Sequence, residues 1–339
     1  MIKTPPTLRN HWFQNNPHVA ILIGIALILF CGVVAVAVWL QPAFRQRSAK
    51  LIIEADGGQV GCNSTTAPLA PEWVGSLLGI DFDSEITYVR IESDAPAEVI
   101  RDLPGIQLLW LEGSLVTDAT MRYLEGRSGP AQLYIIDTNI TAVGLSNLEK
   151  MSDLRGMSLK GKNVSDEWLE QLSQIGIIRQ LEFLLMNNCG VTDHGLKLLE
   201  NSTHIENLGL PDAKITDVGL KYIKNFSGLY SLNLDNTNIS DAGMENLSAF
   251  TKLKILSLNN TKLTDVGFKQ LRKLTHLGYL SLAGTSITDA SLEIIAGFHN
   301  LETLDVSNTQ VSPMGVSRLR NALPNCSVTL WYDASTDGE

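Results

Sequence analysis

The sequence has few cysteines, no known catalytic motif and no acidic residue near its N-terminus. One of its four cysteines, Cys31, lies in an apolar run, and the other three (Cys62, Cys189 and Cys326) are far apart with no C-x-x-C pair. This number and spacing support neither a disulfide framework nor a zinc site. There is also no G-x-S-x-G, no H-E-x-x-H and no glycine-rich phosphate loop. We therefore expect no enzyme, no cofactor and no resident metal.

Two patterns resemble metal sites but each lacks a feature that such a site requires. The stretch "DFDSE" at 81–85 resembles the start of an EF-hand loop, but Ile86 stands where the turn requires glycine. His204 and His276 are 72 residues apart, which is three periods of the repeat described below. Strands stacked about 4.8 Å apart would separate these histidines by roughly 14 Å, too far to share an ion.

The distribution of charge excludes a further class of partner. Residues 1–50 hold five of the 26 Lys and Arg residues and none of the 36 Asp and Glu residues. The rest of the chain is therefore strongly acidic and would repel a phosphate backbone. We expect no binding to nucleic acid.

The longest uncharged run predicts a membrane span. Val19–Leu40 has 22 residues without a charge, and as a helix it would be about 33 Å long, enough to cross a bilayer. The alternative is a cleaved signal peptide with "AVA" at 35–37 as the processing site, but the apolar run continues beyond it. We expect a tail at 1–18 and a single-pass span at 19–40. A small-residue pair, Ala20 and Gly24, would allow weak self-association through this span.

The orientation of the span follows less directly from the sequence. The cations on its two sides nearly balance, so the positive-inside rule barely discriminates. A short N-terminal tail ahead of a large C-terminal body suits a signal-anchor, and we expect the body to lie outside the cytoplasm.

The body of the chain is built on a repeat. An apolar residue followed by Thr or Ser recurs every 24 residues, with one spacing of 27 residues, and such a period is typical of a solenoid. The apolar positions are Val116, Ile140, Val164, Val191, Ile215, Ile239, Leu263, Ile287 and Val311.

Each repeat carries the pattern L-x-x-L-x-L-x-x-T-x-I, as in "LYSLNLDNTNI" at 229, and this pattern resembles the leucine-rich repeat family over about 105–330. The Thr, Ala or Cys where many members have Asn is similar to the cysteine-containing subtype found beside F-box domains, although no F-box precedes it. With the predicted span, the chain is similar to many bacterial membrane proteins. The resemblance implies an α/β solenoid of about nine repeats: a right-handed horseshoe with a parallel sheet on the concave side and helices on the convex side.

The residues themselves support this shape. In L-x-L the two leucines alternate inward on a strand, and L-x-x-L-x-x-F has helical spacing, so the two segments bury a common core. We expect a juxtamembrane segment and N-terminal cap at 41–104, with a short helix at 69–79 and a strand at 86–92. A cap strand at Val328–Leu330 should close the stack, followed by a tail at 331–339.

A Thr or Ser stands at the start of each predicted helix, and an Asp follows it in seven of the nine copies, for example at Thr216 and Asp217. The hydroxyl can cap the helix, and the acid suits the positive end of the helix dipole. Acids at seven of nine equivalent positions are structural, because catalysis needs one acid at one place. If the acid acts only through the helix dipole, Asp217→Ala should lower the free energy of unfolding by about 0.3–1 kcal/mol.

The predicted concave face suggests where a protein or peptide would bind. Its first four repeats present large apolar side chains, whereas the later ones present small polar ones such as Ser257 and Ser281. For Trp110 and Tyr134 the alternative is that the N-terminal cap covers them. The one spacing of 27 residues places three extra residues near 176–180. They either form a loop beside this surface or reflect neutral drift. The candidate partner-binding residues are Trp110, Tyr134, Ile136, Phe183 and Leu185.

We therefore expect a membrane-anchored protein-interaction module. The competing interpretation is a structural cell-envelope component that associates with itself.

Overall fold

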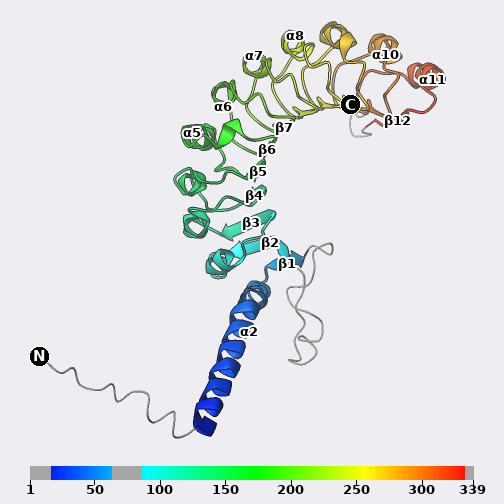
Figure 1. Ribbon diagram of the computed structural model, residues 1–339. Helices are drawn as coiled ribbons and strands as arrows, with labels where there is room; N and C mark the ends of the chain where they lie inside the picture. The colour runs from blue at the N-terminus through cyan, green and yellow to red at the C-terminus, as the bar shows by residue number, and fades with distance from the viewer. Residues whose placement is uncertain (1–16, 63–84, 333–339) are drawn as a thin grey trace, which may run out of the picture.

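The computed structural model of the chain describes residues 17–62 and 85–332. They form an arc in which the strands line the inner side and the helices the outer side, while helix α2 projects from the N-terminal end (Figure 1). This is the predicted leucine-rich repeat solenoid. The expected helix at 69–79, most of "DFDSE" and the ends of both tails lie outside the described residues.

The strands form a single sheet whose spatial order follows the chain from β1 to β12. β1 pairs with β2 in an antiparallel sense, and every later pair is parallel. Residues at the same position of successive repeats lie opposite each other on adjacent strands. Leu280 on β10, for example, lies between Leu256 on β9 and Leu304 on β11. The strands are β1 Gln59–Cys62, β2 Ile86–Ser93, β3 Leu108–Leu115, β4 Gln132–Ile136, β5 Gly156–Lys160, β6 Phe183–Asn187, β7 Asn207–Gly209, β8 Ser231–Asn233, β9 Ile255–Ser257, β10 Tyr279–Ser281, β11 Thr303–Asp305 and β12 Ser327–Thr329.

The convex side is made of short α-helices and 3-10 helices, because each repeat leaves little more than two turns before the chain returns to the sheet. The 3-10 helices are η1 Ala97–Asp102, η2 Arg122–Leu124, η3 Gly144–Leu148, η4 Ile177–Arg179, η5 Asp241–Gly243 and η6 Lys269–Lys273. The α-helices are α2 Pro17–Ala55, α4 Asp118–Met121, α5 Asp166–Gln174, α6 Asp193–Leu198, α7 Leu220–Ile223, α8 Met244–Leu247, α9 Asp265–Phe268, α10 Asp289–Ile295 and α11 Pro313–Ala322.

One continuous core lies between the sheet and these helices. In a typical repeat Leu232 and Leu234 enter it from the strand side, and Leu220, Ile223 and Phe226 enter it from the helix side, all without solvent exposure. No repeat could bury both walls alone, so the stacked neighbours supply the stability.

In several repeats the side chain at the position where many leucine-rich repeats have asparagine is buried and hydrogen-bonded within its own repeat. The Thr237 hydroxyl donates to the Leu234 carbonyl at 2.6 Å, and Thr285 donates to Leu282 at the same distance. At the equivalent place the Cys189 thiol contacts the Met186 carbonyl at 3.6 Å. Ala213 is buried at the same position without any side-chain donor, so this place requires a small side chain and not one particular hydrogen bond.

Helix α2 continues well beyond the predicted end of the span at Leu40 and passes through Pro42 without a break. Among the described residues it is the one helix long and apolar enough to cross a membrane, by length and composition, over Leu29–Ala55. The residues expected to form a juxtamembrane segment therefore begin as helix.

The last turns of α2 pack against the first strands. Ala43, Gln46, Ala49 and Ile53 recur every three or four residues and are all buried, so they form one face of the helix. The backbone N–H of Ile86 donates to the Gln46 side-chain oxygen at 3.0 Å. Little linker therefore separates the apolar helix from the solenoid.

The N-terminal cap contains a diverged repeat that the sequence pattern did not reveal. Ser93 and Asp94 stand where later repeats have Thr–Asp, and the Ala95 N–H donates to the Ser93 hydroxyl at 3.2 Å. The Ser93 hydroxyl donates in turn to Asp56, at the end of α2, at 2.5 Å. The polar contacts that join successive repeats thus begin at α2.

Candidate functional site

The recurring aspartates bridge neighbouring repeats. Each carboxylate accepts two hydrogen bonds from the Thr or Ser of the next repeat, one from its backbone N–H at 2.8–3.0 Å and one from its hydroxyl at 2.5–2.7 Å. We call this set the aspartate ladder. Its carboxylates are Asp94, Asp118, Asp166, Asp193, Asp217, Asp241, Asp265 and Asp289.

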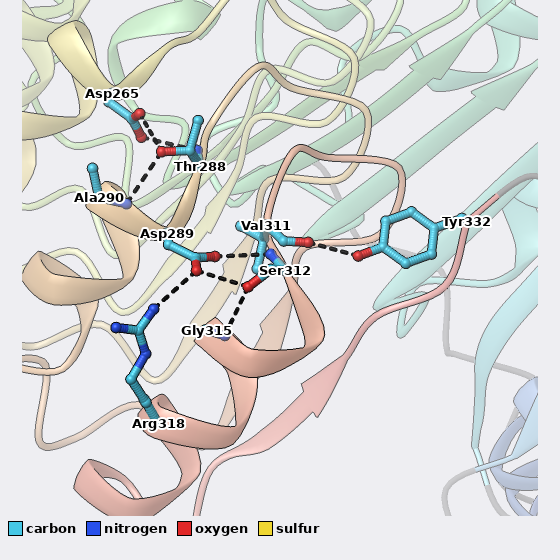
Figure 2. A network of polar contacts seen from close by, with 9 residues as sticks. All are labelled: Asp265, Thr288, Asp289, Ala290, Val311, Ser312, Gly315, Arg318 and Tyr332. Atoms are coloured by element: carbon cyan, nitrogen blue, oxygen red, sulfur yellow. Dashed lines mark hydrogen bonds and ion pairs between the residues drawn. The ribbon is translucent and has the colours of Figure 1, made fainter.

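The last two rungs show the arrangement (Figure 2). Asp289 accepts from the N–H and hydroxyl of Ser312, and the Ser312 hydroxyl accepts from the Gly315 N–H at 2.9 Å. The Arg318 guanidinium also donates to Asp289 at 3.0 Å. The predicted helix caps are therefore confirmed here, and the acid does more than face a helix dipole.

The glycine of the T-D-x-G pattern makes room for this carboxylate. A Cβ at Gly243 would lie 2.5 Å from Asp217 Oδ1, and one at Gly267 would lie 2.3 Å from Asp241 Oδ1. Where the position is Thr120 instead, its hydroxyl donates to the carboxylate of the preceding repeat at 2.6 Å. The glycine is thus explained by a contact with the neighbouring repeat.

One rung of the ladder is absent within the described repeats, and its surroundings change accordingly. Ala142 stands where an aspartate would face Ser165, and the Ser165 hydroxyl makes no cap bond to its own helix. At the glycine position of that next repeat stands Trp168, which is 2% exposed. A large apolar side chain therefore stands beside the place of the missing carboxylate, and the predicted Ser165 cap is wrong.

Three ladder carboxyl groups have a pKa below the ordinary value for aspartate. In Asp94 and Asp265 burial raises the pKa, but the hydroxyl and N–H groups that donate to them lower it by more. In Asp289 the Ser312 N–H is the largest cause of the lowering. A depressed folded-state pKa contributes stability above the unfolded value, near pH 4, and this contribution is lost as the pH falls through the folded value.

Removing one rung should cost more stability than the helix dipole alone predicts. We expect Asp217→Ala to lower the free energy of unfolding by about 1–3 kcal/mol, because it leaves the Ser240 N–H and hydroxyl without their charged acceptor. Urea unfolding followed by circular dichroism would measure this. Glu245→Ala, at an exposed helical acid outside the ladder, is the control. Equal losses would show that the inter-repeat bonds contribute little.

The concave face has the predicted strand register. The residue between the two inward leucines points away from the core in each strand and lies opposite its counterpart in the next. From β2 to β11 this central column reads Arg90, Trp110, Tyr134, Ser158, Leu185, Gly209, Asn233, Ser257, Ser281 and Asp305.

Two of the predicted site residues are in direct contact. The rings of Trp110 and Tyr134 lie with their centroids 4.9 Å apart and tilted by 56°. The Trp110 indole N–H donates to Glu112 at 2.7 Å, and Arg90 pairs with the same carboxylate at 3.1 Å. These contacts hold the aromatic pair in place, with both rings half-buried.

Phe183 and Leu185 rest on glycines of the adjacent strands. A Cβ at Gly156 would lie 3.4 Å from the Phe183 ring, and one at Gly209 would lie 2.4 Å from Leu185 Cδ2. Both side chains are half-buried, as is Ile136, which lies in register between Glu112 and Lys160. The structure therefore places Phe183 and Leu185 together on β6, two strands from Tyr134.

The expectation for the later strands is wrong in one respect. Ser257 and Ser281 are not exposed: they are 6% and 1% accessible. Their hydroxyls donate to Asp235 and Asn259, both at 2.7 Å. Each serine hydroxyl is therefore held in a polar network, and this end of the central column is partly buried.

The three extra residues near 176–180 do not form a loop over the concave face. They form η4, whose Ile177 and Ile178 are almost completely buried. Gln180 then donates to the carbonyls of Met151 and Leu154 at 2.6 and 3.0 Å. The insertion adds to the core and does not adjoin the candidate binding residues as a flexible loop.

A second group of apolar side chains was missed because it lies outside the central column. Tyr230, Ile255 and Tyr279 are 40%, 36% and 39% exposed, at or just before the starts of β8, β9 and β10. The repeat pattern gives these positions no preferred residue type. Only a comparison of the residues that begin successive strands would have revealed them.

No metal site accompanies these surfaces in the part of the chain that the structure describes. There, no three His, Cys, Asp or Glu side chains are placed to hold one ion.

One known family matches part of the solenoid. Residues 251–311 match the family described as leucine rich repeat, whereas no curated protein matches the sequence. Among solved structures, internalin C2 from Listeria monocytogenes is similar with a TM-score of 0.47 and 25% identity, over 64% of this chain and 84% of that one. Another internalin from that organism, inlF, has a TM-score of 0.46 and 18% identity, over 77% and 93% of the two chains.

Proposed function

We propose that this protein is a membrane-anchored leucine-rich repeat module that binds a protein or peptide on its concave face and catalyses no reaction. The observation that carries the proposal is the group of apolar side chains on the concave face of β3, β4 and β6. Trp110, Tyr134, Phe183 and Leu185 are half-buried and positioned by neighbours. Large apolar surface of this kind tends to mark interaction sites, and aromatic residues are favoured anchors.

The anchor part of the proposal is supported by α2. The uncharged run Val19–Leu40 lies within this continuous helix, and the helix then packs on the first strands. We propose that the solenoid lies outside the cytoplasm, the orientation that a signal-anchor helix followed by a large body would give. Reporter fusions before residue 18 and after Glu339 test this. A cytoplasmic signal from the C-terminal fusion would reverse the orientation.

We also propose that the repeats are of the cysteine-containing type, since buried Thr and Cys occupy the usual asparagine position. This assignment concerns the repeat sequence alone and does not imply that an F-box domain accompanies the repeats.

A photo-crosslinker tests the binding surface in the intact membrane. A benzophenone amino acid at Leu185 should form an adduct with a partner, whereas the same group at Val266, 67% exposed on the helical side, should not. Phe183→Ala should weaken this adduct, because it removes a neighbouring anchor worth about 1–2 kcal/mol. Equal adducts from both sites would argue against a concave-face site. Adducts only between copies of this chain would favour the self-associating envelope component.

A further inference from the structure

One junction between neighbouring repeats lacks a backbone hydrogen bond that the others make beside the aspartate ladder. At the other junctions from Val116 to the end of the ladder, the N–H of the residue before the repeated apolar position donates to the carbonyl at that position one repeat earlier. Lys262, for example, donates to Ile239 at 2.9 Å. Among the described residues, Asn163 makes no such backbone bond to Ile140. We call this junction, which lies between β4 and β5, the seam.

The aspartate rung is absent from the same junction. Ala142 has no carboxylate that could accept from Ser165. The junctions on either side are complete, with the rungs of Asp118 and Asp166 in place. Two kinds of polar link that join the repeats elsewhere are therefore both missing at the ladder edge of the seam.

A side-chain amide and apolar packing remain at this edge. The Asn163 amide donates to the carbonyls of Thr138 and Ile140 at 3.1 and 2.7 Å, and Trp168 packs in the common core. Apolar contacts are non-directional, and an amide on a rotatable side chain can follow its acceptor when the backbone moves. The ladder edge of the seam can therefore widen without breaking a backbone hydrogen bond there.

The strands keep the other part of the seam closed. β4 and β5 pair along their whole length, from Gln132 opposite Gly156 to Ile136 opposite Lys160. Where these strands start, the Gly156 N–H donates to the Ala131 carbonyl at 3.1 Å. A junction that is bonded along one side and open along the other allows rotation about the bonded side, which is the geometry of a hinge.

The candidate binding residues lie on both sides of the seam. Trp110, Tyr134 and Ile136 belong to β3 and β4, whereas Phe183 and Leu185 belong to β6. In the order of the sheet, α2 and β1 to β4 lie on one side and β5 to β12 on the other (Figure 1). A rotation at the seam would therefore change the separation of the two halves of the site.

We infer that the solenoid flexes at the seam and that this motion sets the separation of the two halves of the concave site. The inference rests on the binding function proposed above and adds a regulation of the same site. A partner that bridges Tyr134 and Leu185 binds one separation better than the others and shifts the population toward it. Binding would thereby fix β5 to β12 in one position relative to α2.

The first test compares distances across the seam with distances elsewhere, in the full chain in detergent. Spin labels on Ser146→Cys and Lys221→Cys, both exposed helix-side positions, span the seam. The control labels, on Glu170→Cys and Glu245→Cys, occupy the equivalent exposed positions one repeat later and do not span it. Both pairs enclose the same number of repeats, including the repeat of 27 residues.

The labels must report only on the introduced positions. Cys31 and Cys62 are exposed and are first replaced with serine, whereas Cys189 and Cys326 are buried. Double electron–electron resonance should then give a distance distribution at least about twofold broader for the pair that spans the seam than for the control pair. Equal widths would overturn the inference.

A second test locks the seam. A disulfide between Ala142→Cys and Ser165→Cys joins the positions equivalent to Asp217 and Ser240, whose side chains bond at 2.6 Å. With a benzophenone at Leu185, the oxidised chain should give a yield of partner adduct at least about threefold different from that of the reduced chain. An unchanged yield, with the disulfide shown by mass spectrometry, would overturn the regulatory part of the inference.

The distance measurement needs no partner, so it can fail separately from the binding function. A broad distribution across the seam, in a chain that gives no adduct at Leu185, would support the flexing and reject the site that it was inferred to adjust. An adduct at Leu185 together with equal widths would retain the binding site and overturn the seam.

Discussion

Replacing Trp168 with alanine is expected to lower the free energy of unfolding by about 3–5 kcal/mol, the range for removing a buried aromatic side chain. Trp168 is 2% exposed and lies in the common core, where it occupies the position held by glycine in most other repeats. Urea unfolding of the full chain in detergent would measure the loss. A change below about 1 kcal/mol would mean that the surrounding repeats close the cavity.

The cause of the tryptophan can be tested by restoring the missing rung. We expect Ala142→Asp to destabilise the parent chain, because the carboxylate would be buried against the indole of the next repeat. In a Trp168→Gly background the same change should be at least 1 kcal/mol less harmful, since Ser165 can then donate to it as in the other repeats. If Ala142→Asp has the same effect in both backgrounds, Trp168 does not compensate for the missing aspartate.

The second large effect separates core from surface on one strand. Leu184→Ala should cost about 2–5 kcal/mol, because Leu184 is fully buried. Leu185→Ala should cost about 1 kcal/mol or less, because this neighbouring side chain is partly solvated and its Cδ2 lies over Gly209. Thermal or urea unfolding of both variants gives the comparison directly.

The same pair links stability to binding. Leu185→Ala should reduce the crosslinking or affinity of a concave-face partner while the protein stays folded. If Leu185→Ala unfolds the chain as severely as Leu184→Ala, the surface on β6 is a packing surface and the proposed site fails with it.

Much of the fold follows from the sequence because its signals are periodic and local. The alternation of inward leucines, the helical spacing of Leu220, Ile223 and Phe226, and the 24-residue period together predict strand, helix and stacking. The residues on the concave face follow as well, since a strand turns alternate side chains to opposite sides. This is why Trp110, Tyr134 and Leu185 were assigned to one column.

Contacts between repeats were decided by the tertiary structure. The sequence places a threonine or serine before each ladder aspartate, but it does not show that Asp217 bonds to Ser240 one repeat later or that Gly243 leaves space for that carboxylate. Spacing along the chain identifies neighbours within a turn, whereas these partners meet only after the chain has gone once around the solenoid.

The same reason explains the buried serines and the hollows on the surface. Ser257 looks exposed from its column, yet larger neighbours and the Asp235 carboxylate enclose it. Lys254 and His276 line the same two hollows because their repeats lie side by side. The sequence by itself determined the repeating unit and the direction of each side chain. The burial of a side chain, its hydrogen-bond partners and the hollows on the surface depend on side chains that the stack brings together from different repeats. Only the tertiary structure decided these features.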